Sequence, residues 1–514
     1  MSAASRVRVK ALPLLRSPLL ARSSGSGFCS YSSVAAARGL PRRTASCRPS
    51  SSSFSRGVDA AAVRACRAEG VRWNSTESSS SSSSAGSDDG GSVASSQTSL
   101  GSEAEAQPAA PAFSFAFDID GVLLHTSKPI PGASETLRFL QRNSIPFILL
   151  TNGGGKSEAE RVADLTEKLG VELDVSNFVQ SHTPYQKLLD PDAELGHPEL
   201  EKYLEQSLGS KRFSGKETVL VLGSDASKAR RIANGYGFES VVTPGDILRA
   251  CPEIFPFDPL HEFYDRQEIL PLPKPVYSPK ADPAVKLEDC LKIDAILTFN
   301  DPRDWAVDTQ LITDLLLSHK GYLGTYSSRN GDMSLPHPER WQSDGQPPLI
   351  FSNIDLQWST GYHQSRLGQG AFHGAVRRVL QGLMGGWKLK DIRTFEFGKP
   401  FPATYAHAWA TLARHCRRLD LPKPKVVYMV GDNPASDIRG THLWNTHLRE
   451  SPWDRRAALG PYWKSLLVRT GVWKEDAVPV NSLPKGKKPY RAVHDVRSAV
   501  ELALEESKWP GKFE

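Results

Sequence analysis

Several short apolar runs, each followed at once by an acidic or hydroxyl residue, constrain the fold of this chain most strongly. Their length and flanks suit buried β-strands better than helices. A helical stretch at Leu137–Arg142 lies between the first two runs, and a strand, helix, strand unit implies parallel pairing. We therefore predict an α/β fold around a parallel sheet. The runs are Phe113–Phe117 before Asp118, Pro146–Leu150 before Thr151, and Val426–Val430 before Gly431 and Asp432.

A glycine-rich turn follows the second predicted strand. It reads Thr151-Asn152-Gly153-Gly154-Gly155. Ser157 and Glu160 then form a capping-box pattern, which opens a helix that closes at Gly170. The turn is thus predicted at the carboxyl end of a strand and the amino end of a helix.

A second α/β unit is predicted in the middle of the chain. An apolar run followed by a helical stretch occurs there twice, at Val219–Leu222 with Ala229–Ala233 and at Ile293–Phe299 with Thr309–Ser318. Residues 111–170 and 396–514 are therefore assigned to one core domain, and residues 171–395 to a domain inserted into it.

Residues 1–74 have the composition of a mitochondrial transit peptide and leader, because they are rich in arginine and serine and lack acids before Asp59. A disordered basic arm without a targeting role is the alternative. Residues 75–110 consist largely of Ser, Gly, Ala and acids, which cannot bury enough apolar surface to fold. We predict a disordered Ser-rich linker there and a mature protein in the mitochondrial matrix.

Composition argues against several other classes of protein. No stretch approaches the roughly 20 apolar residues of a membrane span. The six cysteines form neither a disulfide framework nor a metal-ligand spacing. Basic residues are concentrated in the leader, and short runs such as Lys485–Lys488 are typical of solvated faces. We expect no transmembrane segment and no nucleic-acid partner.

The polar residues after the predicted strands suit phosphoryl transfer. Ligands of open parallel sheets bind outside the carboxyl ends of the strands, so Asp118 and Asp432 should converge there. Asp118 can accept a phosphoryl group covalently, while Asp120 can protonate the leaving oxygen and later activate water. A divalent cation must neutralise the gathered negative charge, and carboxylates with water and phosphate suit Mg2+.

Four further groups could contact phosphoryl oxygens. They are the Thr151 hydroxyl, the N–H groups of Asn152 and Gly153, and the ammonium of Lys399. Thr151 and Lys399 are therefore candidate catalytic residues, and all four are candidate substrate-binding residues. Because an isolated Asp-x-Asp is common in loops, the prediction depends on the convergence of the segments and not on any one of them.

These segments resemble, in order and placement, the four motifs of haloacid dehalogenase-type phosphatases. They are Asp118-Ile119-Asp120-Gly121-Val122, Thr151-Asn152, Gly398-Lys399-Pro400 and Gly431–Asp437. The long insertion between the second and third motifs resembles the C2-type cap of subclass IIA. The resemblance covers nearly everything after the linker and implies a Rossmann-like parallel-sheet core with an inserted C2-type α/β cap domain.

The resemblance also implies a role for each acid. Asp118 would be the nucleophile and a ligand of Mg2+, and Asp120 the general acid/base, with its backbone carbonyl on the metal. Asp432 would be the other carboxylate ligand. Asp437 would lie behind the ligands and orient water or Lys399, with a simple helix N-cap as its alternative role.

Three more segments resemble one group within this family: Asn300–Trp305, Arg366–Phe372 and Leu467–Trp473. An acid at Asp120 is typical of the phosphatases of the superfamily and not of its dehalogenases. We therefore predict a phosphatase for a small or lipid-linked phosphomonoester. A weak or inactive enzyme that serves as a mitochondrial interaction protein, and a phosphomutase, are the alternatives. Homo-oligomerisation stays open.

Overall fold

The computed structural model describes residues 110–513, apart from residues 258–259, 337–338, 387, 389–390 and 453–459. The predicted leader and all but the last residue of the predicted linker lie outside the described residues. The described residues all belong to one compact unit of the chain.

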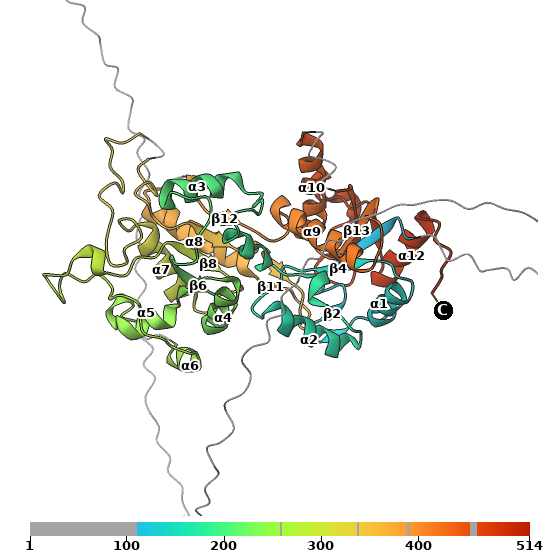
Figure 1. Cartoon of the computed structure of the whole chain (residues 1–514), viewed down its shortest axis with the longest axis horizontal. Helices are drawn as coiled ribbons and strands as arrows, with labels where there is room; N and C mark the ends of the chain where they lie inside the picture. The colour runs from blue at the N-terminus through green and yellow to red at the C-terminus, as the bar shows by residue number, and fades with distance from the viewer. Residues whose placement is uncertain are drawn as a thin grey trace, which may run out of the picture. The chain divides into compact units, whose positions relative to one another are not determined.

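Six parallel strands form the first sheet, in the order β15-β14-β13-β1-β4-β5. Figure 1 labels β13 and β4 of this sheet. The six strands of this sheet are β1 (Phe113–Phe117), β4 (Phe147–Leu150), β5 (Phe178–Val179), β13 (Val426–Gly431), β14 (Trp463–Val468) and β15 (Arg491–Val493). The strands predicted from the three apolar runs are confirmed as β1, β4 and β13.

Helices cover both faces of this sheet. Side chains alternate along β1, so Phe115 and Phe117 pack in one layer and Ala116 in the other. The capping box of α2 is confirmed, since Ser157 Oγ accepts from the N–H of Glu160 and the helix closes at Gly170. The first layer contains α1 (Ala133–Arg142), α2 (Glu158–Leu169) and α12 (Val496–Glu506), and the second α9 (Pro402–Arg418) and α10 (Arg439–Glu450).

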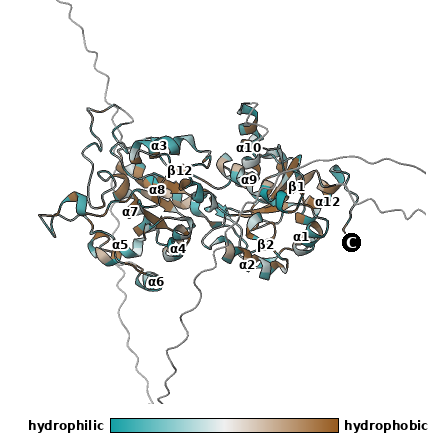
Figure 2. Cartoon of the chain, in the orientation of Figure 1, coloured by the Kyte–Doolittle hydropathy of each residue, from teal (hydrophilic) through white to brown (hydrophobic). Residues whose placement is uncertain are grey.

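The second sheet has five parallel strands in the order β12-β9-β8-β6-β7. Its strands are β6 (Thr218–Leu222), β7 (Ser240–Val242), β8 (Ala295–Thr298), β9 (Leu349–Phe351) and β12 (Phe395–Glu396). One face carries α5 (Pro244–Ala250), α7 (Trp305–Leu316) and α8 (Gln369–Leu383), and the other α3 (Pro198–Leu208) and α4 (Ala226–Tyr236). Figure 2 shows hydrophobic colour around α7 and α8, whose apolar side chains pack on this sheet.

The described residues also form two short hairpins and a short helix outside the two main sheets. The hairpins are β2 (Leu124–His125) with β3 (Lys128–Pro129) and β10 (Gln357–Trp358) with β11 (Arg366–Leu367), and the helix is α6 (His261–Asp265). The N–H of Gly361 donates to Thr126 Oγ1 at 2.7 Å, which joins the loops of the two hairpins.

The second sheet is inserted between β5 and β13, which confirms the predicted α/β fold with an inserted α/β domain. The predicted boundary at residue 171 lies before β5, and the boundary at 395 lies inside β12. Both strands have two residues, too few to produce a periodic pattern. No helix among the described residues is long and apolar enough to cross a bilayer.

Candidate active site

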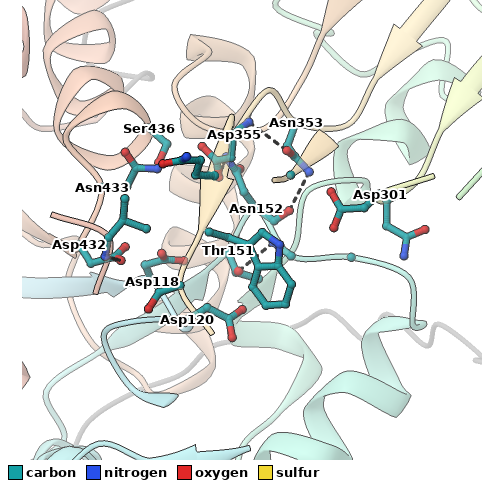
Figure 3. Close-up of a pocket in the computed structure, with 18 of the residues that line it drawn as sticks. Asp118, Asp120, Thr151, Asn152, Asp301, Asn353, Asp355, Asp432, Asn433 and Ser436 are labelled. Atoms are coloured by element: carbon teal, nitrogen blue, oxygen red, sulfur yellow. Dashed lines mark hydrogen bonds between the residues drawn. The ribbon is translucent and has the colours of Figure 1, made fainter. Parts of the chain in front are cut away.

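The carboxyl ends of β1, β4 and β13 meet at one cavity of about 300 Å3. Asp118, Thr151 and Asp432 each follow one of these strands directly, and all three line the cavity. Figure 3 shows Asp118, Asp120 and Asp432 near one another, with Asp301 on the opposite side of the view. Asn152 and Gly153 also line the cavity.

Lys399 lies behind the cavity and is almost completely buried, with 1% of its surface exposed. Its Nζ is 2.8 Å from Asp118 Oδ1 and 2.7 Å from Asp437 Oδ1, and it donates to the carbonyl of Leu150 at 2.9 Å. These contacts use all three donors of the ammonium. Burial alone would lower the pKa of Lys399, but the carboxylates of Asp118 and Asp437 outweigh it and raise the pKa above its usual range.

The Asn152 side chain fixes the backbone of Lys399. Its Oδ1 accepts from the Lys399 N–H at 2.7 Å, and its Nδ2 donates to the Lys399 carbonyl at 2.8 Å. The same Nδ2 donates to Asp355 Oδ2 at 2.9 Å, and Asn353 Nδ2 donates to the Asn152 carbonyl at 3.0 Å. The side chain of Asn152 therefore positions the lysine, a role that its sequence context did not predict.

Thr151 and Gly153 are coupled within the glycine-rich turn. The Gly153 N–H donates to Thr151 Oγ1 at 2.9 Å, so the hydroxyl acts as acceptor there and keeps its hydrogen for another partner. The Thr151 N–H donates to the carbonyl of Val179 on β5. The turn thus offers a hydroxyl donor to the cavity.

Asp120 is half-buried, and its Oδ2 lies 3.8 Å from Arg161 NH2 on α2. Burial and the neighbouring charge of Asp118 raise the pKa of Asp120 to about 6, although Arg161 opposes the shift. Asp120 is therefore poised between its protonated and ionised forms near neutral pH.

Asp432 is buried at the end of β13, and two glycines make room for its side chain. Its Oδ2 accepts from the Val472 N–H at 2.6 Å. A Cβ at Gly471 would lie 1.8 Å from this oxygen, and a Cβ at Gly121 would lie 2.4 Å from it. Burial, followed by the charges of Asp118 and Asp437, raises the pKa of Asp432 well above its usual value.

Gly471→Ala is expected to displace Asp432 and to lower the free energy of unfolding by about 1–3 kcal/mol through overpacking. Gly374→Ala is the matched control, because Gly374 lies in α8 with nothing near its added Cβ. That control should leave the protein as stable as wild type or up to about 1 kcal/mol more stable. Urea denaturation of both variants measures the difference, and equal stabilities would contradict the proposed crowding.

Asp437 supports the cavity from behind. The N–H of Asn433 donates to its Oδ2 at 2.9 Å, while its Oδ1 faces Lys399. Its alternative role as a helix N-cap is wrong, because it lies inside the turn η6 (Pro434–Ile438), whose N-cap is Asn433. Burial and Asp118 raise the pKa of Asp437 to about 6, against the charge of Lys399.

Three carboxylates could hold a metal ion here. Asp118, Asp432 and Asp437 each offer one oxygen, and these oxygens lie within 4.8 Å of one another. Both oxygens of Asp437 already face protein donors, whereas Asp118 Oδ2 and Asp432 Oδ1 have no hydrogen-bond partner among the described residues. The donors are oxygens only, a set that fits a hard cation such as Mg2+.

Several cavity residues come from the inserted domain or from α2 and lie outside the four sequence motifs, and the sequence predicted no role in the site for any of them, although three belong to the segment Asn300–Trp305. Burial raises the pKa of Asp355 to about 7, against the opposing charge of Lys399. Arg161, in α2, belongs to none of the sequence motifs. Another four residues of the inserted domain line the cavity: Asn300, Asp301 and Arg303 in the loop after β8, and Trp358 in β10.

Comparison with known proteins agrees with this architecture. The sequence model of a family described as haloacid dehalogenase-like hydrolase matches residues 115–239. A mitochondrial hydrolase of Saccharomyces cerevisiae is 36% identical over 412 residues, which are 76% of this chain and 95% of the yeast protein.

Two further similarities are more partial. A Schizosaccharomyces pombe protein named as a cardiolipin synthase (CMP-forming) and mitochondrial hydrolase fusion is 35% identical over 367 residues, 71% of this chain and 49% of the fusion protein. The crystal structure of a glycerol phosphate phosphatase from Mycobacterium tuberculosis is 17% identical, with 76% of each chain covered and a TM-score of 0.40. From the family match and the extent of the yeast similarity, we conclude that this chain belongs to the haloacid dehalogenase-like hydrolases.

Proposed function

We propose that this protein is a magnesium-dependent phosphatase that cleaves a phosphomonoester through a phospho-aspartyl intermediate on Asp118. The observation that supports this most is the contact of Lys399 with both Asp118 and Asp437 at the carboxyl edge of the first sheet. A buried lysine fixed by two acids, beside two further acids in one cavity, is costly for a structural role alone.

Each residue has a defined part in the proposed reaction. Asp118 attacks phosphorus through one of its carboxylate oxygens, and Lys399 positions this carboxylate through its contact with Oδ1. Asp120 protonates the leaving alcohol and then takes a proton from the water that hydrolyses the phospho-aspartate. The Thr151 hydroxyl and the N–H group of Asn152 bind phosphoryl oxygens, while the predicted donor at Gly153 instead donates to Thr151 Oγ1 and orients that hydroxyl.

The carboxylates of Asp118 and Asp432, with the backbone carbonyl of Asp120, would bind Mg2+. When bound, the cation neutralises negative charge on the phosphoryl oxygens. Asp437 keeps Lys399 in place and takes no part as a ligand in this proposal.

Asp120→Asn gives the test of this chemistry. With isotopically labelled phosphomonoester and Mg2+, wild type should release phosphate, and Asp120→Asn should lose turnover but still acquire label on Asp118. Acid quenching and peptide mapping measure that label. Kinetics identical to wild type would remove Asp120 from the scheme. Stable labelling of wild type without phosphate release would favour a phosphomutase.

We further propose a mitochondrial location. The arginine- and serine-rich composition of residues 1–74 supports it, as do the names of the two fungal relatives. Fractionation of cells that express the full chain tests it, and recovery outside mitochondria would contradict it.

A further inference from the structure

The loop Asn300–Trp305 extends from the end of β8 to the cavity, where Asn300, Asp301 and Arg303 line it. Its shape is fixed by local bonds. Asn300 accepts from the Ser224 N–H at 3.0 Å and donates to Ser224 Oγ at 2.7 Å. Trp305 Nε1 donates to the Pro302 carbonyl at 3.0 Å, and Asp304 accepts from the N–H of Val307 in the first turn of α7. The loop is therefore a preformed part of the cavity wall.

Two other cations, Lys399 behind the cavity and Arg161 in its wall, already have acidic partners. Lys399 contacts Asp118, Asp437 and a backbone carbonyl. Arg161 donates to Asp164 at 3.0 Å and lies 3.8 Å from Asp120. Neither side chain is therefore available to bind a second charged group of the substrate.

Arg303 differs from both of these cations. It is exposed, and in the described part of the chain its guanidinium has no hydrogen-bond or ion-pair partner. A guanidinium presents five donors in a planar fork that matches carboxylate and phosphate oxygens. Such a group on a fixed loop of a cavity wall is suited to bind an anion.

The neighbouring acid does not neutralise Arg303 through a direct contact. Burial raises the pKa of Asp301 and the nearby charge of Arg303 opposes the shift, but Asp301 takes its hydrogen bond from the backbone N–H of Gln369 and none from the guanidinium. On the core side, the cavity presents Asp118, Asp120 and Asp432. The cavity thus has acids that can bind a metal and a phosphoryl group in one region. On the inserted domain it has a cation, Arg303, whose guanidinium donates no hydrogen bond within the described residues.

We propose that Arg303 binds a second anionic group, a carboxylate or a phosphate, on the alcohol part of the phosphomonoester. This inference rests on the proposed phosphatase function and names the substrate class for the same cavity. A cavity of about 300 Å3 is at the small end of ligand pockets, which favours a small phosphorylated acid or bisphosphate over a lipid.

The test compares matched esters. 3-Phosphoglycerate carries a carboxylate where glycerol 3-phosphate carries a hydroxymethyl group, and propane-1,3-diol bisphosphate supplies a second phosphate instead. Wild type should have a higher kcat/KM for at least one of the two esters that carry a second anionic group than for glycerol 3-phosphate. Arg303→Gln should reduce kcat/KM for that ester about 10-fold or more, and leave glycerol 3-phosphate within about 2-fold of wild type.

Two controls make the comparison specific. Arg303→Lys keeps the charge but not the fork, and should retain part of the preference. Arg249→Gln removes an exposed arginine of α5 that does not line this cavity, and should leave kcat/KM unchanged for all three esters. Calorimetric titration of Asp118→Asn, with and without Arg303→Gln, measures the dissociation constants of the same esters without turnover.

The outcomes separate the two proposals. Equal losses of kcat/KM in Arg303→Gln for the esters with and without a second anionic group, or no loss, would overturn the role of Arg303, while phosphate release would still support a phosphatase. Faster hydrolysis of dioleoyl phosphatidate vesicles than of all three small esters would also overturn it. A wild-type protein that binds the esters and never releases phosphate would refute the phosphatase instead.

Discussion

Asp118→Asn is expected to reduce phosphate release by about 1,000-fold or more, because the amide fills the same space but cannot serve as the nucleophile. Lys399 keeps its contacts with Asp437 and with the Leu150 carbonyl, so the variant should remain folded. Steady-state release of phosphate in the presence of Mg2+ measures the loss, and circular dichroism verifies the fold.

The control for this substitution is Asp476→Asn, which removes an exposed carboxylate outside the cavity and should leave turnover unchanged. Retention of most wild-type activity by Asp118→Asn would refute the covalent mechanism. A loss of similar size in Asp476→Asn would instead point to a general effect of net charge.

Chelation is expected to stop phosphate release completely, and added Mg2+ should restore it. Because Mg2+ binds the native site and not the unfolded chain, it should also raise the melting temperature. At a free concentration of about 1,000 times Kd, the stabilisation is about 4 kcal/mol. Differential scanning calorimetry with increasing Mg2+ measures this effect.

Asp432→Asn should weaken that stabilisation, because one of the two proposed carboxylate ligands is lost. Without Mg2+, the variant should be as stable as wild type or more stable, since one buried acid no longer repels Asp118 and Asp437. The Val472 N–H can still donate to the amide oxygen. Full magnesium affinity in the variant would show that Asp432 is not a ligand.

Local signals in the sequence were sufficient for the elements around the site. β1 spans the predicted residues Phe113–Phe117, because its apolar run is long enough and is followed directly by Asp118. The capping box at Ser157 depends on residues three positions apart, so a single pattern contains the whole interaction. The convergence of strand ends followed from parallel pairing alone.

The contacts that organise the site could not be predicted in this way. Asn152 meets Asp355 and Lys399 across separations of 203 and 247 positions, and no local pattern reports such a pair. The free guanidinium of Arg303 likewise depends on what surrounds it in three dimensions. Short strands such as β5 and β12 were also not predicted, because a strand of two residues is too short to show an alternating pattern.

The bonds from Asn152 to Lys399 have a consequence for the order of folding. During synthesis the ribosome makes Asn152 long before Lys399, and the whole second sheet is translated between them. Closing a loop of that length in an unfolded chain costs entropy, but β6 and β12 belong to one sheet, so prior folding of the inserted domain shortens the effective loop. We therefore expect the inserted domain to fold before Lys399 reaches Asp118, which is synthesised much earlier. Until then, the carboxylate of Asp118 has no ammonium partner.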